Sequence, residues 1–299
     1  MNVAVNGPSA DPHRPFFADP AVLRRACRSG AFTGQTAGQC PGALQANLVM
    51  LPKEAADEFL AFAARNAKPC PLVGVSDPGS PHLPMVADDL DLRTDVPLYR
   101  VFRDGEAAGD VADITHLWRD DLVTFALGCS FSFEEALIAE GLPVRHSAAG
   151  RNVPMYVTNR ATQPAGRFEG PMVVSMRAMP PEAAIRAVVL SDRQPMAHGA
   201  PVHIGDPAAL GIADVTAPDF GDPPVIMDGD ICVFWACGVT PQRALKAAKV
   251  PFAITHAPGF MLVTDLIAEG LTTFPTPTSR RITPPRHPPN APTLGPPIP

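Results

Sequence analysis

Two cysteines and two hydroxyl residues recur at matching points of one pattern that the sequence contains twice. Cys129 and Cys237 lie 108 positions apart, and in each copy a proline follows 14 positions after the cysteine. Ser132 and Thr240 coincide when the copies are aligned, and both copies continue to a histidine, a glycine and a second strand. The repetition predicts a duplicated core whose two turns face one another.

Each turn is typical of a helix start after a buried strand. Ser132 stands three residues before Glu135, as in a capping box, and Thr240 is followed by Pro241, which suits a first helical position. Because a helix N-terminus has unpaired N–H groups and partial positive charge, each turn can hold a carboxylate or an oxyanion. In the alternative interpretation, the hydroxyls only cap the helices and the cysteines are only small buried apolar groups.

The second copy is the stronger candidate for a site. Gly238 lets the backbone come close to a ligand, and the polar atoms of Thr240 and Gln242 follow the end of a strand. Open α/β sheets place their ligands at such strand ends.

Alternating strands and helices must position these turns, so the predicted fold class is α/β, with an internally duplicated strand-turn-helix core. Residues 161–224 differ in character and predict a smaller inserted α+β subdomain, which makes residues 15–160 and 225–271 a discontinuous core. Residues 272–299 hold ten of the 37 prolines and predict a disordered tail. The alternative for the tail is a docking segment for a proline-reading domain.

Composition limits the partners. The chain has 299 residues, of which 46% are hydrophobic, so it can bury a sizeable core. A net charge of −6, without a basic cluster interleaved with aromatics, argues against nucleic acid. No apolar run approaches the ~20 residues that cross a bilayer, so we expect no membrane partner and a cytoplasmic protein. The six cysteines form no CxxC pair, and we expect reduced thiols.

Five segments together resemble the D-glutamate cyclase family of bacterial hydro-lyases, and the match runs from about Phe16 to Leu271. The segments are Gln45-ANLVMLP, Gly128-CSFSFE, Asn152-VPMYVTN, Phe234-WACGVTPQ and Thr255-HAPGFMLVTD. The resemblance implies a lyase that closes D-glutamate to 5-oxo-D-proline with loss of water, needs no organic cofactor and has an α/β architecture of two unlike parts. The resemblance does not assign a role to any residue, so the candidate roles of the side chains are inferred from their chemistry.

Cyclisation of glutamate needs a neutral amine, an electrophilic γ-carboxyl group and stabilisation of an oxyanion. His256 is the first candidate for proton transfer because its pKa can lie near neutrality, the alternative being a core histidine. The helix beginning near Thr240 offers the N–H groups of Gly238 and Val239 as oxyanion donors. Cys237 is less suited as a covalent nucleophile, because a free carboxylate is a poor acceptor for a thiolate.

A substrate with two carboxylates suits two opposed helix N-termini, the second of which follows Ser130 and Ser132. Arg145 or Arg177 is a candidate to pair with the α-carboxylate, although single arginines are mostly surface charges. Asn159 and Asp265 are equivalent in the two copies and are predicted either to bind the α-amine or to close turns.

A metal site is the remaining alternative. His198 and His203, or Asp228 and Asp230, offer suitable ligand types, but neither spacing is diagnostic. The resulting expectation is an enzyme without metal or cofactor that acts on a small amino-dicarboxylate. The alternatives are a hydro-lyase for another small hydroxy or amino acid and a non-catalytic accessory protein that binds 5-oxoproline or glutamate. A homo-oligomer is compatible with the sequence.

Overall fold

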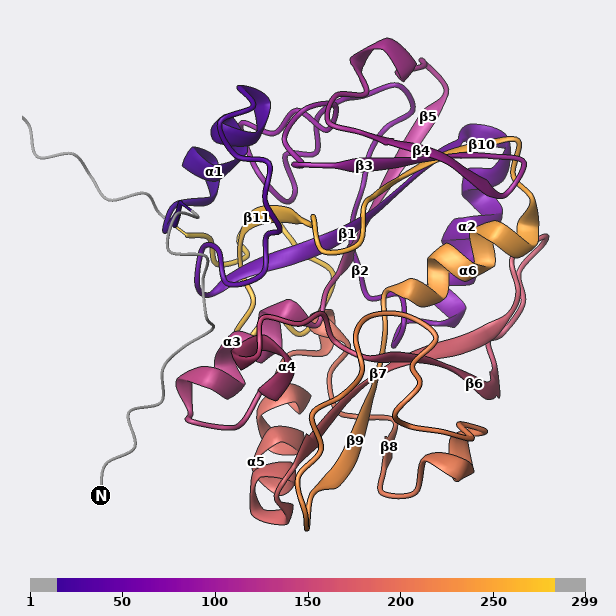
Figure 1. Cartoon of the computed structure of the whole chain (residues 1–299). Coiled ribbons are helices and arrows are strands. Elements are labelled where there is room, and N and C mark those ends of the chain that lie inside the picture. Colours follow the sequence, from indigo (N-terminus) through magenta and orange to yellow (C-terminus); the bar gives the residue numbers. More distant parts are fainter. Residues whose placement is uncertain (1–14, 283–299) are drawn as a thin grey trace, which may run out of the picture.

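The computed structural model describes residues 15–282, which form two antiparallel sheets flanked by helices (Figure 1). The larger sheet has the order β2–β5–β1–β10–β3–β4, with β11 also paired to β1. Its strands are β1 (Ala43–Pro52), β2 (Leu72–Val75), β3 (Tyr99–Arg103), β4 (Glu106–Val111), β5 (Leu122–Gly128), β10 (Phe252–His256) and β11 (Leu262–Ile267). The smaller sheet, in the order β6–β7–β9–β8, contains β6 (Met155–Ala161), β7 (Pro171–Met179), β8 (His203–Ile204) and β9 (Ile231–Ala236).

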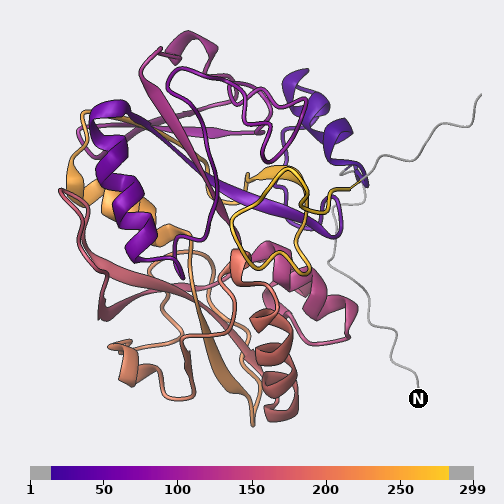
Figure 2. The ribbon, with the colours of Figure 1, turned by 180° about the vertical axis from the view of Figure 1, so that it is seen from behind.

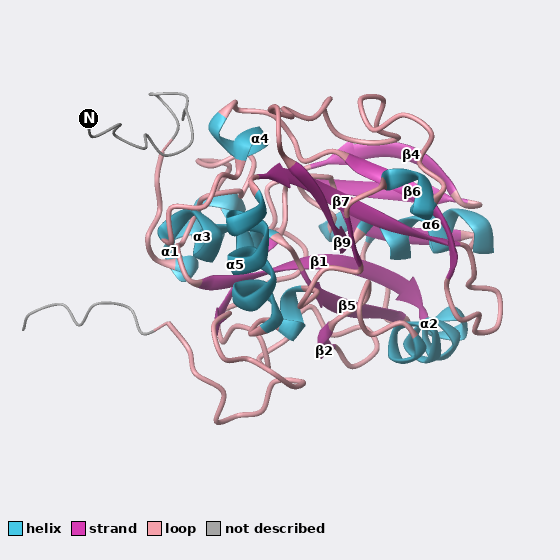
Figure 3. Cartoon of the chain, turned by 90° about the horizontal axis from the view of Figure 1, so that it is seen from below, coloured by secondary structure: helices cyan, strands magenta, loops and turns pink. Residues whose placement is uncertain are grey.

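Six α-helices flank these sheets in the described part of the chain: α1 (Pro20–Arg28), α2 (Lys53–Arg65), α3 (Phe131–Ala139), α4 (Arg145–Ala148), α5 (Pro181–Asp192) and α6 (Val239–Ala248). Short 3₁₀ turns cover Thr115–Leu117, Pro195–Ala197 and Pro207–Leu210. Helices α2 and α6 lie on one flank and contribute to one apolar cluster, while α3 and α5 pack together on the other flank (Figures 1 and 2). The view from below shows the same two flanks on either side of the sheets (Figure 3).

The mixture of helix and strand agrees with the predicted α/β class, but the strand pairing differs from that of an open parallel sheet. All described strand pairs are antiparallel. The reason is topological. Helices α3 and α6 lead the chain to the other sheet, and β5 lies between β1 and β2, the two strands that α2 connects. The carboxyl ends of parallel strands therefore cannot define the site here, as the sequence argument assumed.

Strand β1 runs through the middle of the larger sheet and is buried along its whole length. Its side chains alternate between two apolar clusters, with Leu48 and Met50 in one and Val49 and Leu51 in the other. A strand that is buried on both faces reads as a continuous apolar run. This explains why the segment after Gln45 carries so few polar residues.

In the structure, each copy of the predicted duplication leads the chain from one sheet to the other. The first copy leads from β5 of the larger sheet through Cys129 and α3 to β6 of the smaller sheet. The second copy leads from β9 of the smaller sheet through Cys237 and α6 to β10 of the larger sheet. The chain thus crosses once in each direction, and the two turns meet where the sheets adjoin.

The repeat also extends to a pair of segments that the sequence analysis did not connect. Strand β1 and helix α2 correspond to β7 and α5, at an offset of 128 positions. Pro52 and Pro180 precede the two helices with nearly equal backbone angles, φ −56° with ψ 144° and φ −56° with ψ 153°. A Glu-Ala-Ala sequence follows two positions after each of these prolines. Each half therefore supplies two strand-helix units.

The predicted domain boundaries cut across the smaller sheet. Strands β7 and β8 lie within the proposed insert of residues 161–224, whereas β9 and all of β6 except Ala161 fall within the proposed core. The division into domains stays a prediction. Part of the predicted disordered tail has a defined position, because Arg281 pairs with Asp88 at 2.6 Å and Ile282 N–H donates to Asp265 O at 2.7 Å. Residues 283–299 of that tail lie outside the described part.

Phe59 of α2 is the centre of an aromatic cluster that joins the helix to the larger sheet. Its side chain is fully buried, and its ring centroid lies 4.9 Å from that of Phe125 and 5.3 Å from that of Phe168. We expect Phe59→Ala to lower the free energy of unfolding by about 3–5 kcal/mol, because it leaves a cavity. Urea titration monitored by circular dichroism measures this value. The control Ile185→Ala, at a side chain that is 68% exposed, should cost less than about 0.5 kcal/mol.

Candidate functional site

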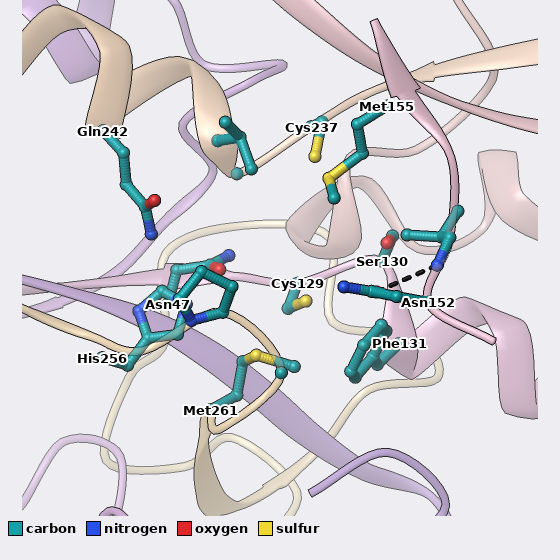
Figure 4. A pocket seen from close by; sticks show the side chains of 15 residues that line it. Asn47, Cys129, Ser130, Phe131, Asn152, Met155, Cys237, Gln242, His256 and Met261 are labelled. Carbon is teal, nitrogen blue, oxygen red and sulfur yellow. Dashed lines mark hydrogen bonds between the residues drawn. The ribbon is translucent and has the colours of Figure 1, made fainter. Parts of the chain in front are cut away.

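The two equivalent turns line a single pocket (Figure 4), which confirms that they face one another. Its volume is about 50 Å³. The lining consists of Asn47, Cys129, Ser130, Phe131, Asn152, Val153, Met155, Cys237, Gly238, Val239, Gln242, His256, Pro258, Gly259 and Met261. No aspartate, glutamate, lysine or arginine is among these residues. The pocket is therefore polar at a few points and carries no formal charge of its own.

The same pair of hydrogen bonds fixes both turns. In the first copy, Cys129 N–H donates to Gln45 O at 2.9 Å, and Gln45 N–H donates to Ser132 Oγ at 2.9 Å. In the second copy, Cys237 N–H donates to the carbonyl oxygen of Val173 in β7 at 3.0 Å. The Val173 N–H donates to Thr240 Oγ1 at 3.0 Å. Each turn thus clasps one residue of a neighbouring strand, and we call this arrangement the turn clasp.

The turn clasp corrects the predicted helix caps. Helix α3 begins at Phe131 and α6 at Val239, and neither has a side-chain cap. Ser132 lies inside its helix, and Glu135 accepts from Gly42 N–H at 2.9 Å instead of closing a capping box. The hydroxyl of Thr240 is likewise bound to a strand and does not line the pocket. A cross-strand partner has displaced the local one in both copies.

His256 lies at the end of β10 and presents one edge of its ring to the pocket. Leu48 N–H donates to Nδ1 at 3.0 Å, so the ring hydrogen stands on Nε2. Burial and the nearby charge of Arg100 lower the pKa of His256 to about 4. In this state the imidazole is a neutral hydrogen-bond donor at neutral pH, which suits it to stabilise an oxyanion better than to accept a proton.

Asn47 and Gly238 are in close contact on the wall of the pocket. A Cβ atom at position 238 would stand 2.4 Å from Asn47 Nδ2, so a larger residue there would displace the Asn47 side chain. Asn47 Nδ2 donates to Leu127 O and Gly128 O at 3.4 and 3.2 Å, which leaves Oδ1 as a free acceptor among the described groups. This acceptor can receive an N–H group of a ligand.

Ser130 is connected to a buried charge network behind the pocket. Arg177 is 2% exposed, donates from Nη2 to Ser130 Oγ at 3.2 Å and forms an ion pair with Glu134. Its guanidinium carbon also lies 5.0 Å from the ring centroid of Phe133 and 5.2 Å from that of Trp235. Because Ser130 Oγ accepts from Arg177, its own hydrogen is free to donate into the pocket.

Glu134 balances the charge of Arg177. Despite burial, the positive charge of Arg177 and the neighbouring His146 lower the pKa of Glu134 to about 2. Oε1 of Glu134 lies 3.2 Å from His146 Nε2. The guanidinium of Arg177 already binds Glu134, and Arg177 does not line the pocket, so its predicted pairing with a substrate carboxylate stays a prediction.

Both cysteines that line the pocket are thiols at neutral pH. Burial raises the pKa of Cys129 to about 12 and that of Cys237 to about 11. This disfavours a thiolate nucleophile at either position.

Several predicted site residues lie elsewhere. Arg145 forms an ion pair with Asp230, and Asp265 pairs with Arg24 at 2.7 Å. Asn159 is exposed on β6, outside the pocket. Of the predicted binding residues, the pocket brings together Gly238, Gln242 and Ser130, with Cys237 and His256 from the catalytic set.

Each of the two histidines considered as metal ligands has one ring nitrogen beside a backbone carbonyl oxygen. His198 Nδ1 lies 2.9 Å from Lys68 O, and His203 Nε2 lies 2.8 Å from Asp206 O. Within residues 15–282, no group of three or more His, Cys, Asp or Glu side chains is arranged to hold a metal ion.

The sequence analysis missed Asn47, Asn152 and the two methionines Met155 and Met261. The sequence does point to Asn47 as a site residue, because it is a polar residue within the otherwise apolar run after Ala46. No sequence feature marks the two methionines as pocket residues, because methionine side chains most often lie in the core.

The sequence of the chain is similar to those of proteins named as hydro-lyases. The sequence profile described as D-glutamate cyclase matches residues 123–265, which include both turns. A protein of Rhizobium johnstonii named "Putative hydro-lyase" is 58% identical over 83% of this chain and 93% of its own. Proteins of the same name from Methylobacterium radiotolerans and Gluconacetobacter diazotrophicus are 54% identical (88% of this chain, 97% of theirs) and 58% identical (86% and 92%).

The chain belongs to the D-glutamate cyclase family. Among solved structures, a nitrogen repressor-like protein from Methanococcus jannaschii covers 80% of this chain and 92% of its own, with a TM-score of 0.34 and 9% identity. None of the helices in residues 15–282 combines the length and the apolar character needed to cross a bilayer.

The turn clasp predicts the effect of Thr240→Val. The variant keeps the shape of the side chain but leaves the buried N–H of Val173 without its acceptor, which we expect to cost about 1–3 kcal/mol of stability. Thermal unfolding followed by circular dichroism measures the loss. Thr273→Val, at an exposed position, is the matched control and should leave the melting temperature nearly unchanged. Equal melting temperatures for the two variants would contradict the structural role of Thr240.

The lowered pKa of His256 predicts the pH dependence of stability. The unfolded chain protonates this residue near pH 6.5, whereas the folded chain does so only near pH 4. Stability should therefore fall as the pH decreases from 6.5 towards 4, and His256 should contribute no pH dependence above that window. His256→Gln should make the acid side of the profile shallower, whereas His116→Gln, at an exposed residue, should not. Urea unfolding at a series of pH values provides the comparison.

Proposed function

We propose that the protein closes D-glutamate to 5-oxo-D-proline with loss of water, in the pocket between the two turns. The supporting observation is that the pocket carries no formal charge yet offers donors from two opposed turns. Membership of the D-glutamate cyclase family is the second support. The substrate is a small amino-dicarboxylate.

The uncharged lining supplies a physical reason for cyclisation. In water, glutamate has a charged amine and two charged carboxylates. Removal from water disfavours each charged form, so it lowers the pKa of the ammonium group and raises that of a carboxylate. A proton can then pass from the amine to the γ-carboxylate within the substrate. This transfer produces the neutral amine and the neutral carboxyl group that ring closure needs, without a separate general base.

The remaining groups have distinct tasks. The amine nitrogen attacks the γ-carbon, and the oxyanion that forms receives the hydrogen bond of His256 Nε2–H. Ser130 Oγ–H, backed by Arg177, binds the α-carboxylate. Asn47 Oδ1 accepts from the amine and directs its lone pair to the γ-carbon. The C–N bond forms first and gives the oxyanion. The C=O bond then re-forms as the C–O bond to the hydroxyl breaks, and the hydroxyl leaves as water with a proton from the nitrogen.

A hydro-lyase for another small hydroxy or amino acid would use the same donors, and a binding protein without turnover would use the same pocket. No contact in the pocket favours either of these over cyclisation. Substrate profiling separates the first, and calorimetric binding without product separates the second.

Proton NMR of D-glutamate and of L-glutamate, incubated with the protein, tests the proposal. We expect 5-oxoproline to accumulate from the D isomer. Absence of product from D-glutamate, with turnover of another hydroxy or amino acid, would overturn the substrate assignment.

Variants separate the two tasks. His256→Leu removes the oxyanion donor and should lower kcat by about 10²–10³-fold, with partial recovery in His256→Gln. Ser130→Ala should mainly raise KM, by about 10–100-fold, because it removes a hydrogen bond to a charged group. Ser147→Ala, at a serine outside the pocket, should match the wild type. Unchanged kcat and KM in both pocket variants, with the fold intact, would remove this pocket from consideration.

A further inference from the structure

The ring closure described above uses neither of the two thiols that line the pocket. Cys129 and Cys237 occupy equivalent places in the duplicated turns, and their side chains extend into the pocket from different walls (Figure 4). They are 8% and 7% exposed. The duplication has thus placed two identical acid–base groups around one ligand space.

Two such groups suit inversion by a two-base mechanism. A base on one face of a carbon atom removes its proton while an acid on the other face supplies one, and the configuration at that carbon inverts. We propose that the protein also exchanges the α-proton of a small α-amino acid or its lactam held in this pocket, with Cys129 and Cys237 acting on opposite faces of the α-carbon. This activity goes beyond the proposed cyclisation and does not depend on it.

The step is balanced without an oxidant or a cofactor. The thiolate of one cysteine forms an S–H bond with the α-hydrogen, and the electron pair of the C–H bond remains on the substrate as an enediolate of its carboxylate. The second thiol gives its proton to the opposite face and becomes the thiolate. His256 Nε2–H and Ser130 Oγ–H, which converge on the same space, can donate to the enediolate oxygens.

The surroundings of the sulfurs define the expected pH dependence. Glu134 raises the pKa of both thiols and Arg177 lowers it, and Cys129 also experiences Cys237. His256 is the other titratable residue of the pocket lining, and it stays neutral above about pH 4. With both thiol pKa values well above neutrality, the reactive thiolate is scarce but strongly basic. The exchange rate should therefore increase about tenfold per pH unit between pH 7 and 9.

The test is proton NMR in D₂O with 5-oxo-D-proline, with D-glutamate as a second probe, combined with chiral chromatography. The full chain should remove the α-proton signal of at least one of them, and the L isomer should appear at a rate that rises with pH. Stable α-protons in both compounds up to pH 9 would overturn the proposal. Because ring closure is read from 5-oxoproline formation, it can fail or succeed independently of this result.

Cysteine variants make the assignment specific. Cys129→Ser and Cys237→Ser should each reduce formation of the opposite isomer at least 100-fold, and the corresponding alanine variants should do the same. Cys232→Ser, at a half-buried cysteine of β9 outside the pocket, is the matched control and should keep the wild-type rate. Circular dichroism confirms that each variant is folded. Inversion that persists in the folded double variant, or that is lost equally in Cys232→Ser, would contradict the two-cysteine assignment.

Discussion

The turn clasp is the interaction on which the rest of the structure depends. In each copy, one residue of a neighbouring strand exchanges two backbone-directed hydrogen bonds with a turn, through a cysteine N–H and a hydroxyl oxygen. The clasp ties the start of α3 to the larger sheet and the start of α6 to the smaller one. Because each helix then leads the chain to the other sheet, both helix starts are fixed where the two sheets adjoin. The pocket is the space left between these two starts.

The clasp also explains the chemistry that the pocket offers. The hydroxyl oxygens of Ser132 and Thr240 accept hydrogen bonds from the N–H groups of β1 and β7. The ligand space is therefore lined by the turn backbone, two thiols and a few amides. The nearby charges of Arg177 and Glu134 lie behind the pocket lining, where the two side chains form an ion pair. Such a pocket favours neutral forms of an amine and a carboxyl group, and it retains directed donors at Ser130 and His256. The duplicated turns form two walls of the pocket, and the two walls differ in their side chains.

Part of this arrangement was predictable from sequence. The cysteine and proline spacing identified the two equivalent turns, and the apolar runs identified buried strands such as β5 and β9. The match between β1–α2 and β7–α5 was missed because the strands share almost no side chains, as the pairs Asn47 and Ser175 or Val49 and Arg177 show. The role of Ser132 was misjudged for a different reason. A serine hydroxyl can accept a hydrogen bond from an N–H group of its own helix or of a distant strand. The sequence does not reveal which strand lies beside the serine.

The central claim is that the two turns bind one substrate beside a neutral His256. The most direct measurement is ¹⁵N NMR of histidine-labelled protein, with and without 5-oxo-D-proline, with His256 assigned through His256→Gln. The account predicts a ring that is protonated only at Nε2 from pH 5.5 to 8 and whose Nε2 signal shifts when the lactam binds. A charged or Nδ1-protonated ring, or a signal that saturating lactam leaves unchanged, would contradict it.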